Sequence, residues 1–169
     1  MSLYWYQILD RALHNKITWW GDLLLRNYLQ SFSTQFLFIN GDLNPRHSPQ
    51  GIGQFYKIEF VFLLLGFLFF LTKFTDKKPK AFLIFWLLVA PIPAALTRDG
   101  GMHATRLFFL LPPLIFLVTL GVYYSWETFN KKWQGIFIVG TVAAYLLSFL
   151  FYQHNFWVHY PWNSERWWH

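Results

Sequence analysis

The sequence contains no cysteine, which excludes disulfide bonds, thiolate metal sites and a cysteine nucleophile. It is also poor in charge: Asp, Glu, Lys and Arg make up 13% of the 169 residues, whereas soluble domains average about 25%. No stripe of Lys and Arg follows a polar face, so the net charge of +6 does not indicate a nucleic-acid partner. No acidic residue lies in the middle of an apolar run, although coupled transporters commonly need buried ionisable groups there. These absences disfavour a water-facing globular domain, a nucleic-acid-binding protein and a small transporter.

Apolar and aromatic residues are abundant instead. Hydrophobic residues make up 55% and aromatic residues 23% of the chain, with 20 Phe and 10 Trp. Apolar stretches approach the roughly 17–25 residues with which a helix crosses a bilayer, so we predict an all-α membrane protein with about four transmembrane helices. The predicted helices are Gly53–Leu71, Ala81–Leu96, Leu107–Tyr124 and Ile136–Tyr152. Proline pairs predict kinks in the second and third of them, at Pro91–Pro93 and Pro112–Pro113.

The two ends of the chain mix aromatic residues with polar and charged ones. Trp and Tyr favour the headgroup zone, so Leu3–Leu29 is predicted to form one or two helices lying in the membrane interface. A loose remnant of a larger protein is the alternative for this stretch. The chain then divides into an extracytoplasmic interfacial region and polar loop (1–52), a four-helix transmembrane region (53–152) and an aromatic extracytoplasmic tail (153–169) that looks cut short.

The lysines predict the orientation in a cell membrane. Four lysines lie within Lys73–Lys80, and two more, Lys131 and Lys132, lie between the third and fourth predicted helices. Short loops rich in Lys and Arg stay in the cytoplasm. The N-terminal region, the loop between the second and third helices, and the tail are therefore predicted to lie outside.

Two polar loops are thereby predicted to meet on the outer face. In Asn40–Gln54, Ser48-Pro49 is typical of an N-cap and first helical position. In Thr97–Arg106, Asp99 is the predicted N-cap of the third helix. Each predicted helix start carries an Arg and a His beside backbone N–H groups that favour an anion.

This arrangement predicts a cradle for a phosphate at the membrane surface, because Arg binds phosphate through a bidentate fork. The predicted lipid-phosphate-binding residues are Arg46, His47, Arg98, His103 and Arg106, with Glu59 and Asp99 in supporting roles. The alternative is that the arginines only anchor the loops at the lipid headgroups.

No metal site or cofactor is predicted. His154 and His159 are five positions apart, which is not a helix-face ligand spacing, and no carboxylate cluster accompanies them.

The loop segments resemble a known family. FLFINGDLNPRHSPQGIGQFY, APIPAALTRDGGMHATRLFFLLPPL and HNFWVHYP are similar to segments of bacterial GT-C membrane glycosyltransferases, in the branch like protein mannosyltransferases and aminoarabinose transferases. The resemblance covers most of the chain from about Tyr28 onward. It implies transfer of a sugar from a polyprenyl-phosphate carrier to an extracytoplasmic acceptor, with the lipid-linked sugar as donor substrate.

The chain departs from that family in two ways. Members typically have many more membrane helices, and their catalytic acidic residue lies in an early outer loop, a context that neither Asp10 nor Asp22 matches. We therefore expect the later portion or a truncated form of such an enzyme, partnered by the missing N-terminal helices. The alternative is a non-catalytic polytopic membrane subunit that binds a lipid phosphate or assists complex assembly.

Overall fold

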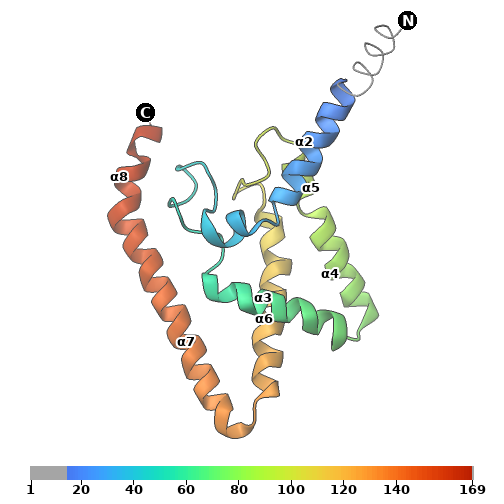
Figure 1. Cartoon of the computed structure of the whole chain (residues 1–169), viewed down its shortest axis with the longest axis vertical. Coiled ribbons are helices and arrows are strands. Elements are labelled where there is room, and N and C mark those ends of the chain that lie inside the picture. The colour runs from blue at the N-terminus through green and yellow to red at the C-terminus, as the bar shows by residue number, and fades with distance from the viewer. Residues whose placement is uncertain (1–14, 169) are drawn as a thin grey trace, which may run out of the picture.

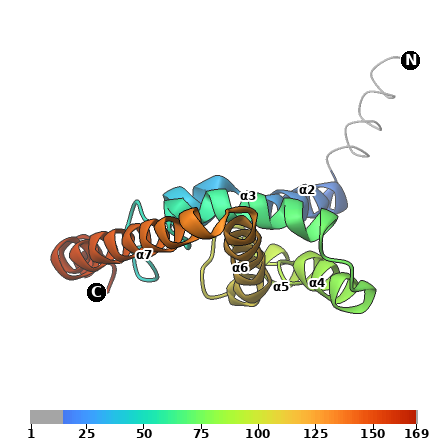
Figure 2. The same ribbon diagram turned by 90° about the horizontal axis from the view of Figure 1, so that it is seen from below.

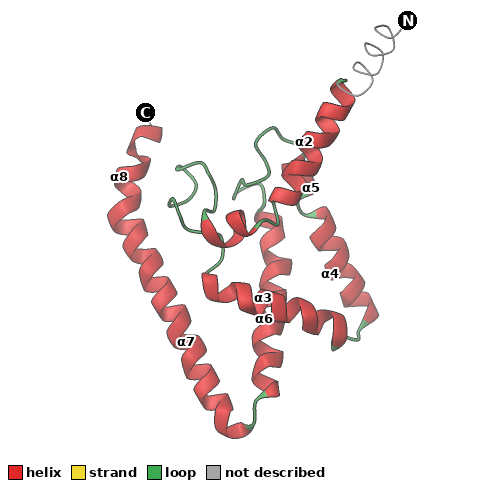
Figure 3. Ribbon diagram, in the orientation of Figure 1, coloured by secondary structure: helices red, strands yellow, loops and turns green. Residues whose placement is uncertain are grey.

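The computed structural model describes residues 15–168, and within this range every regular element is a helix. Figure 3 shows these helices joined by loops. The first part of the predicted interfacial stretch, residues 1–14, and the last residue, His169, lie outside the described range. In chain order the elements are α2 (Lys16–Gln30), the π-helix η1 (Gln35–Ile39), α3 (Lys57–Thr72), α4 (Lys77–Val89), α5 (Ile92–Ala95), the 3₁₀ turn η2 (Phe108–Leu110), α6 (Leu111–Thr128), α7 (Lys131–His154), the π-helix η3 (Asn155–His159), α8 (Tyr160–Ser164) and the 3₁₀ turn η4 (Glu165–Trp167).

Three helical segments in the described residues are long and apolar enough to cross a membrane. They are Lys77–Ala95, Phe108–Thr128 and Lys131–Trp167. The all-α membrane class predicted from the sequence agrees with this, but the predicted number of four spans does not. The first predicted span, Gly53–Leu71, corresponds to α3, which has only 16 residues.

The shortness of α3 has a local cause. The residues just before it are held by backbone hydrogen bonds to η1, from Phe55 N to Leu37 O at 2.8 Å and from Gln54 N to Phe36 O at 3.4 Å. The helix therefore begins only at Lys57, and the predicted N-cap at Ser48-Pro49 is wrong. Figures 1 and 2 both show α3 lying across the axis of α6 instead of running beside it.

The prolines act differently in the two helices where kinks were predicted. α4 ends at Val89 and the separate short helix α5 follows Pro91, so the predicted break is present. Pro112 and Pro113, however, occupy the first turn of α6, where a missing N–H costs no helical hydrogen bond. The helical span therefore begins at Phe108 with the 3₁₀ turn η2, close to the predicted start at Leu107, and α6 follows from Leu111; Asp99 is the N-cap of neither.

Helices α3 and α6 cross at two glycines. A Cβ atom added to Gly66 would lie 1.8 Å from Leu117 O, and one added to Gly121 would lie 1.9 Å from Phe62 O. Only the missing side chains let the two backbones approach so closely. Around this crossing a buried cluster joins η1, α3, α5 and α6, including Phe36, Phe38, Phe62, Ala94, Leu110, Leu114 and Val118.

The long helix α7 buries none of its residues, and its large apolar side chains are exposed along its length. It begins after the N-cap Asn130, whose side chain accepts a hydrogen bond from Trp133 N. An apolar helix without a protein partner on most of its surface is typical of a lipid-facing span.

At one end of α6 the polar loops 40–56 and 96–107 come together, and the turn between α6 and α7 lies at the other end (Figure 1). Helix α2 braces this polar end. The buried Asn27 donates through Nδ2 to Ala95 O at 3.2 Å and to Thr97 O at 2.7 Å, and Tyr28 donates to Leu88 O at 3.0 Å. These bonds fix where the second polar loop leaves α5.

Candidate functional site

The two polar loops are joined by one buried carboxylate, Asp42, whose side chain is 3% exposed. Asp42 Oδ1 accepts from Asn44 N at 2.8 Å, and Oδ2 accepts from Ala104 N of the other loop at 2.8 Å. Gly41 makes the turn before it with a φ of 68°, and a Cβ there would lie 2.3 Å from Ile52 O. The left-handed turn needs glycine, and it directs Asp42 inward.

Two imidazoles stand beside this carboxylate. His47 Nδ1 is 2.9 Å and His103 Nδ1 is 3.8 Å from the same oxygen, Asp42 Oδ2. The two imidazole ring centres are 4.7 Å apart. One ligand atom from each of the three side chains lies within 4.8 Å of the others. Burial lowers the pKa of His103, although the Asp42 carboxylate acts in the opposite direction, so the neutral imidazole is favoured at neutral pH.

Arg98 and Arg106 line a cavity of about 580 Å³ on the same side of the molecule, together with Asp42, Asn44, Asp99 and His103. Arg106 Nη1 donates to Thr97 Oγ1 at 2.7 Å. Within residues 15–168, neither guanidinium forms an ion pair with a carboxylate. Both arginines keep donors for an anion that enters this cavity.

Arg46 is placed differently. It donates through Nε to Trp167 O, its guanidinium carbon lies 5.9 Å from the centre of the Trp168 ring, and its own carbonyl accepts from Tyr160 Oη at 2.9 Å. Arg46 thus connects the first loop to the C-terminal segment. It does not line the cavity that contains Arg98 and Arg106, which we call the arginine cavity. Of the five predicted phosphate ligands, the cavity brings together Arg98, His103 and Arg106.

The two predicted supporting acids, Glu59 and Asp99, lie in different parts of the structure. Glu59 accepts from Tyr56 N at 2.6 Å, which caps α3, and from Tyr145 Oη of α7 at 3.2 Å. It lines a second cavity of about 400 Å³, together with His47. Asp99 lies exposed in a turn at the rim of the arginine cavity.

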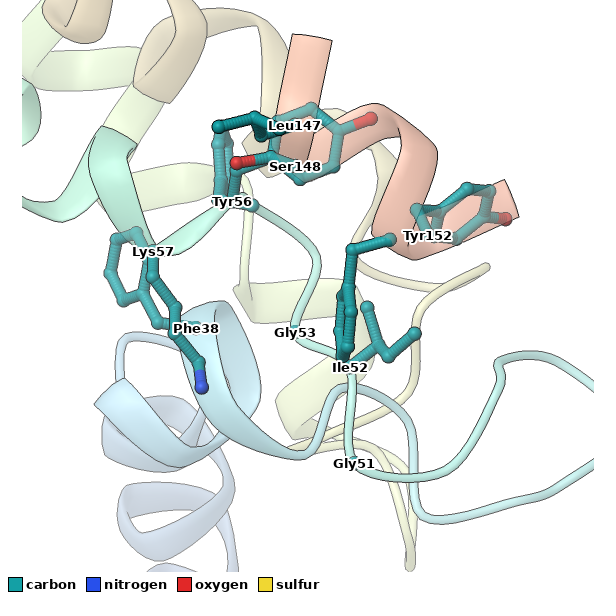
Figure 4. A pocket seen from close by; sticks show the side chains of 11 residues that line it. Phe38, Gly51, Ile52, Gly53, Tyr56, Lys57, Leu147, Ser148 and Tyr152 are labelled. Atoms are coloured by element: carbon teal, nitrogen blue, oxygen red, sulfur yellow. The ribbon is translucent and has the colours of Figure 1, made fainter. Parts of the chain in front are cut away.

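A third cavity, of about 350 Å³, lies between residues 51–57 and α7 (Figure 4). Its walls are mainly apolar, with Phe38, Ile52, Leu147 and Phe151 among them. It shares residues 52, 53, 55, 56 and 152 with the second cavity, so the two are adjacent.

Sequence reasoning missed Asp42, the residue at the centre of the site. In the sequence, Asn40-Gly41-Asp42 is only a turn signal. The available signal was an acidic residue that follows a turn glycine and precedes a His by five positions. His154 and His159 do approach each other, with ring centres 5.2 Å apart, but no carboxylate of the described residues pairs with either imidazole.

Comparison with protein-family models, with curated proteins and with solved structures finds no match for this chain. The chemistry of the site therefore rests on its own residues. Two guanidinium groups without carboxylate partners in the described residues line a cavity, and the carboxylate that joins the two loops lies beside it with two imidazoles.

Proposed function

We propose that this chain binds the phosphate of a polyprenyl-phosphate-linked sugar at the outer surface of a membrane, as part of a sugar-transferring enzyme. The observation that carries the proposal is the cavity that Arg98 and Arg106 line together without carboxylate partners in the described residues. Paired guanidiniums in a partly enclosed space suit an anion with several oxygens, because each group can form charge-assisted hydrogen bonds.

Two further features support a lipid-linked phosphate. The loops that line the cavity lie at the end of α6 away from the start of α7 (Figure 1), where Lys131 and Lys132 stand. This is the outer side if Lys-rich segments stay in the cytoplasm. The apolar cavity between residues 51–57 and α7 offers walls against which a prenyl chain would pack. Sugar transfer itself is supported by the resemblance of the NPRHS and DGGMHATR segments to GT-C glycosyltransferases.

A non-catalytic subunit that binds the same phosphate is the second candidate. It is favoured by the state of Asp42, whose two oxygens already accept hydrogen bonds from Asn44, Ala104 and His47. A carboxylate so fully committed is a poor general base, and the reaction would need an acid or base from elsewhere.

Arginine variants test the proposal. Binding of a short-chain polyisoprenyl phosphate to the protein in nanodiscs would be measured by native mass spectrometry for Arg98→Gln, Arg106→Gln and the wild type. Each charged hydrogen bond contributes about 1.5–3 kcal/mol, so each variant should weaken binding by roughly tenfold to a hundredfold. Arg106→Lys should restore only part of the affinity, since Lys lacks the planar fork.

Arg26→Gln is the matched control, because Arg26 pairs with Asp22 on the exposed face of α2. Unchanged binding in the control and loss in both cavity variants support the proposal. Equal affinities in all the variants, or an affinity that does not exceed that for a neutral prenyl alcohol, would refute it and leave the arginines as headgroup anchors.

A further inference from the structure

We propose that Asp42, His47 and His103 form a binding site for a divalent transition-metal ion such as Zn²⁺. The sequence-based expectation of no metal considered only His154 and His159, because nothing in the spacing of residues 42, 47 and 103 places them together. This inference goes beyond phosphate binding and does not depend on Arg98 or Arg106.

The distances match those of a metal-ligand set. Zn²⁺ lies about 2.0–2.2 Å from imidazole nitrogen and carboxylate oxygen, so two ligands of a tetrahedral site are about 3.3 Å apart. Asp42 Oδ2 is 2.9 Å from His47 Nδ1 and 3.8 Å from His103 Nδ1, which brackets that value. All three ligand atoms lie within 4.8 Å of one another, so they must move closer together to surround one ion.

The three side chains make more contacts than are needed to hold the two polar loops together. The hydrogen bond from Ala104 N to Asp42 already joins the two loops, and the one from His47 holds Asp42 within its own loop. His103 is too far from the carboxylate to add a hydrogen bond, yet its Nδ1 lies near the same oxygen and its ring lies close to that of His47. Two imidazoles converging on one carboxylate oxygen are the donor set of a metal site with open positions.

The surroundings supply the outer contacts that such sites need. Backbone N–H groups of Asn44 and Ala104 donate to the two oxygens of Asp42 and fix the carboxylate plane. Ligating carboxylates in metal sites are commonly held by hydrogen bonds of this kind. Thr105 Oγ1 lies 3.0 Å from His103 Nδ1, and this contact would be exchanged for the metal.

The donor atoms select the class of ion. Two nitrogens and one oxygen suit Zn²⁺ and its neighbours among the first-row metals, whereas Mg²⁺ and Ca²⁺ prefer oxygen ligands only. Asp42 and His103 line the arginine cavity and His47 lines the cavity that contains Glu59, so an ion held here borders both. Its remaining coordination positions would be open to water or to an anionic oxygen.

Zinc titration of the full chain in detergent tests the inference. Protein stripped with EDTA would be titrated with Zn²⁺ in competition with a chromogenic chelator, and the loaded protein examined by X-ray absorption at the zinc edge. One ion per chain with two imidazoles among its ligands is the expected result, with no competition from millimolar Mg²⁺. His103→Gln should lower the affinity by at least about 10–100-fold, because loss of even an outer partner of a metal ligand has that effect.

The variants are chosen to separate binding from folding. His103 forms no hydrogen bond to Asp42, so His103→Gln leaves the contacts of Asp42 with Asn44, Ala104 and His47 in place. His154→Gln and His159→Gln are matched controls from the second His pair and should retain the zinc affinity. A spectrum that shows the ion on His154 and His159, or equal losses in all three variants, would overturn the proposal.

The zinc measurement is also independent of the lipid proposal. Arg98→Gln and Arg106→Gln should bind Zn²⁺ as the wild type does even where they lose polyisoprenyl phosphate. Absence of zinc binding with intact lipid binding would reject the metal site alone.

Discussion

At the scale of single residues, Asp42 is the side chain on which the geometry of the site depends. Three donors from two loops meet its carboxylate, and each donor would lose its partner if the acceptor were removed. A buried donor left without an acceptor loses its hydration without compensation, which is why such removal is more costly than the net worth of the bond.

Asp42→Asn should therefore destabilise the protein even without metal. An amide keeps one acceptor oxygen but sets its NH₂ against the N–H of Asn44 or of Ala104. We expect a loss of about 1–3 kcal/mol, measured as a lower midpoint of thermal unfolding in detergent with chelator present. The control is Asp22→Asn on α2, which removes the exposed ion pair with Arg26. Loss of this pair should lower the free energy of unfolding by no more than about 1 kcal/mol. Equal midpoints for the two variants would contradict the role assigned to Asp42.

At the scale of elements, the crossing of α3 over α6 determines where the first polar loop is held. Because α3 lies across α6, its N-terminus at Lys57 is carried toward α7, where Glu59 meets Tyr145. The loop that contains Asp42 therefore connects the end of η1 to the start of α3. Close contact at Gly66 and Gly121 fixes the crossing point.

Alanine at either crossing glycine should force the helices apart. The added methyl group would meet backbone oxygen at 1.8 Å in Gly66→Ala and 1.9 Å in Gly121→Ala. Overpacking of this kind typically costs about 1–3 kcal/mol, so both variants should unfold at lower temperature. Gly135→Ala and Gly140→Ala on α7 are the controls, since nothing lies within 4 Å of either added Cβ. There we expect no loss, or a gain of up to about 1 kcal/mol from the better helix former.

At the scale of the whole molecule, the proposed orientation in the membrane would place the arginine cavity at the outer leaflet. The loops that form the site lie at one end of α6, and the start of α7, which carries Lys131 and Lys132, lies at the other (Figure 1). Lysine-rich short loops face the cytoplasm, so the cavity is expected on the outer side.

Cysteine labelling tests this orientation on a clean background, because the chain has no cysteine of its own. In intact cells a membrane-impermeant maleimide should label Asp99→Cys, whose native side chain is exposed at the rim of the arginine cavity, and should leave Lys78→Cys and Lys132→Cys unlabelled. All three should react after permeabilisation. Labelling of the lysine positions from outside would reverse the proposed leaflet.

The sequence by itself determined the composition-driven features of this protein. Long apolar runs predicted an all-α membrane protein, since in lipid a helix satisfies its own backbone. The break at Pro91 was likewise local and predictable, because proline disrupts helical hydrogen bonds wherever it stands inside a helix.

Only the tertiary structure decided the count of candidate spans and the centre of the site. α3 is shortened by hydrogen bonds to η1, which hydropathy does not register. Arg46 donates a hydrogen bond to the carbonyl of Trp167, 121 positions away in the chain, whereas Arg98 and Arg106 line the cavity. The role of Asp42 in the site depends on its contacts with Ala104 and His103, which lie 62 and 61 positions further along the chain. The sequence of a turn does not show whether its carboxylate is exposed to water or buried. Burial depends on packing between loops that are distant in the chain, which excludes water from the carboxylate.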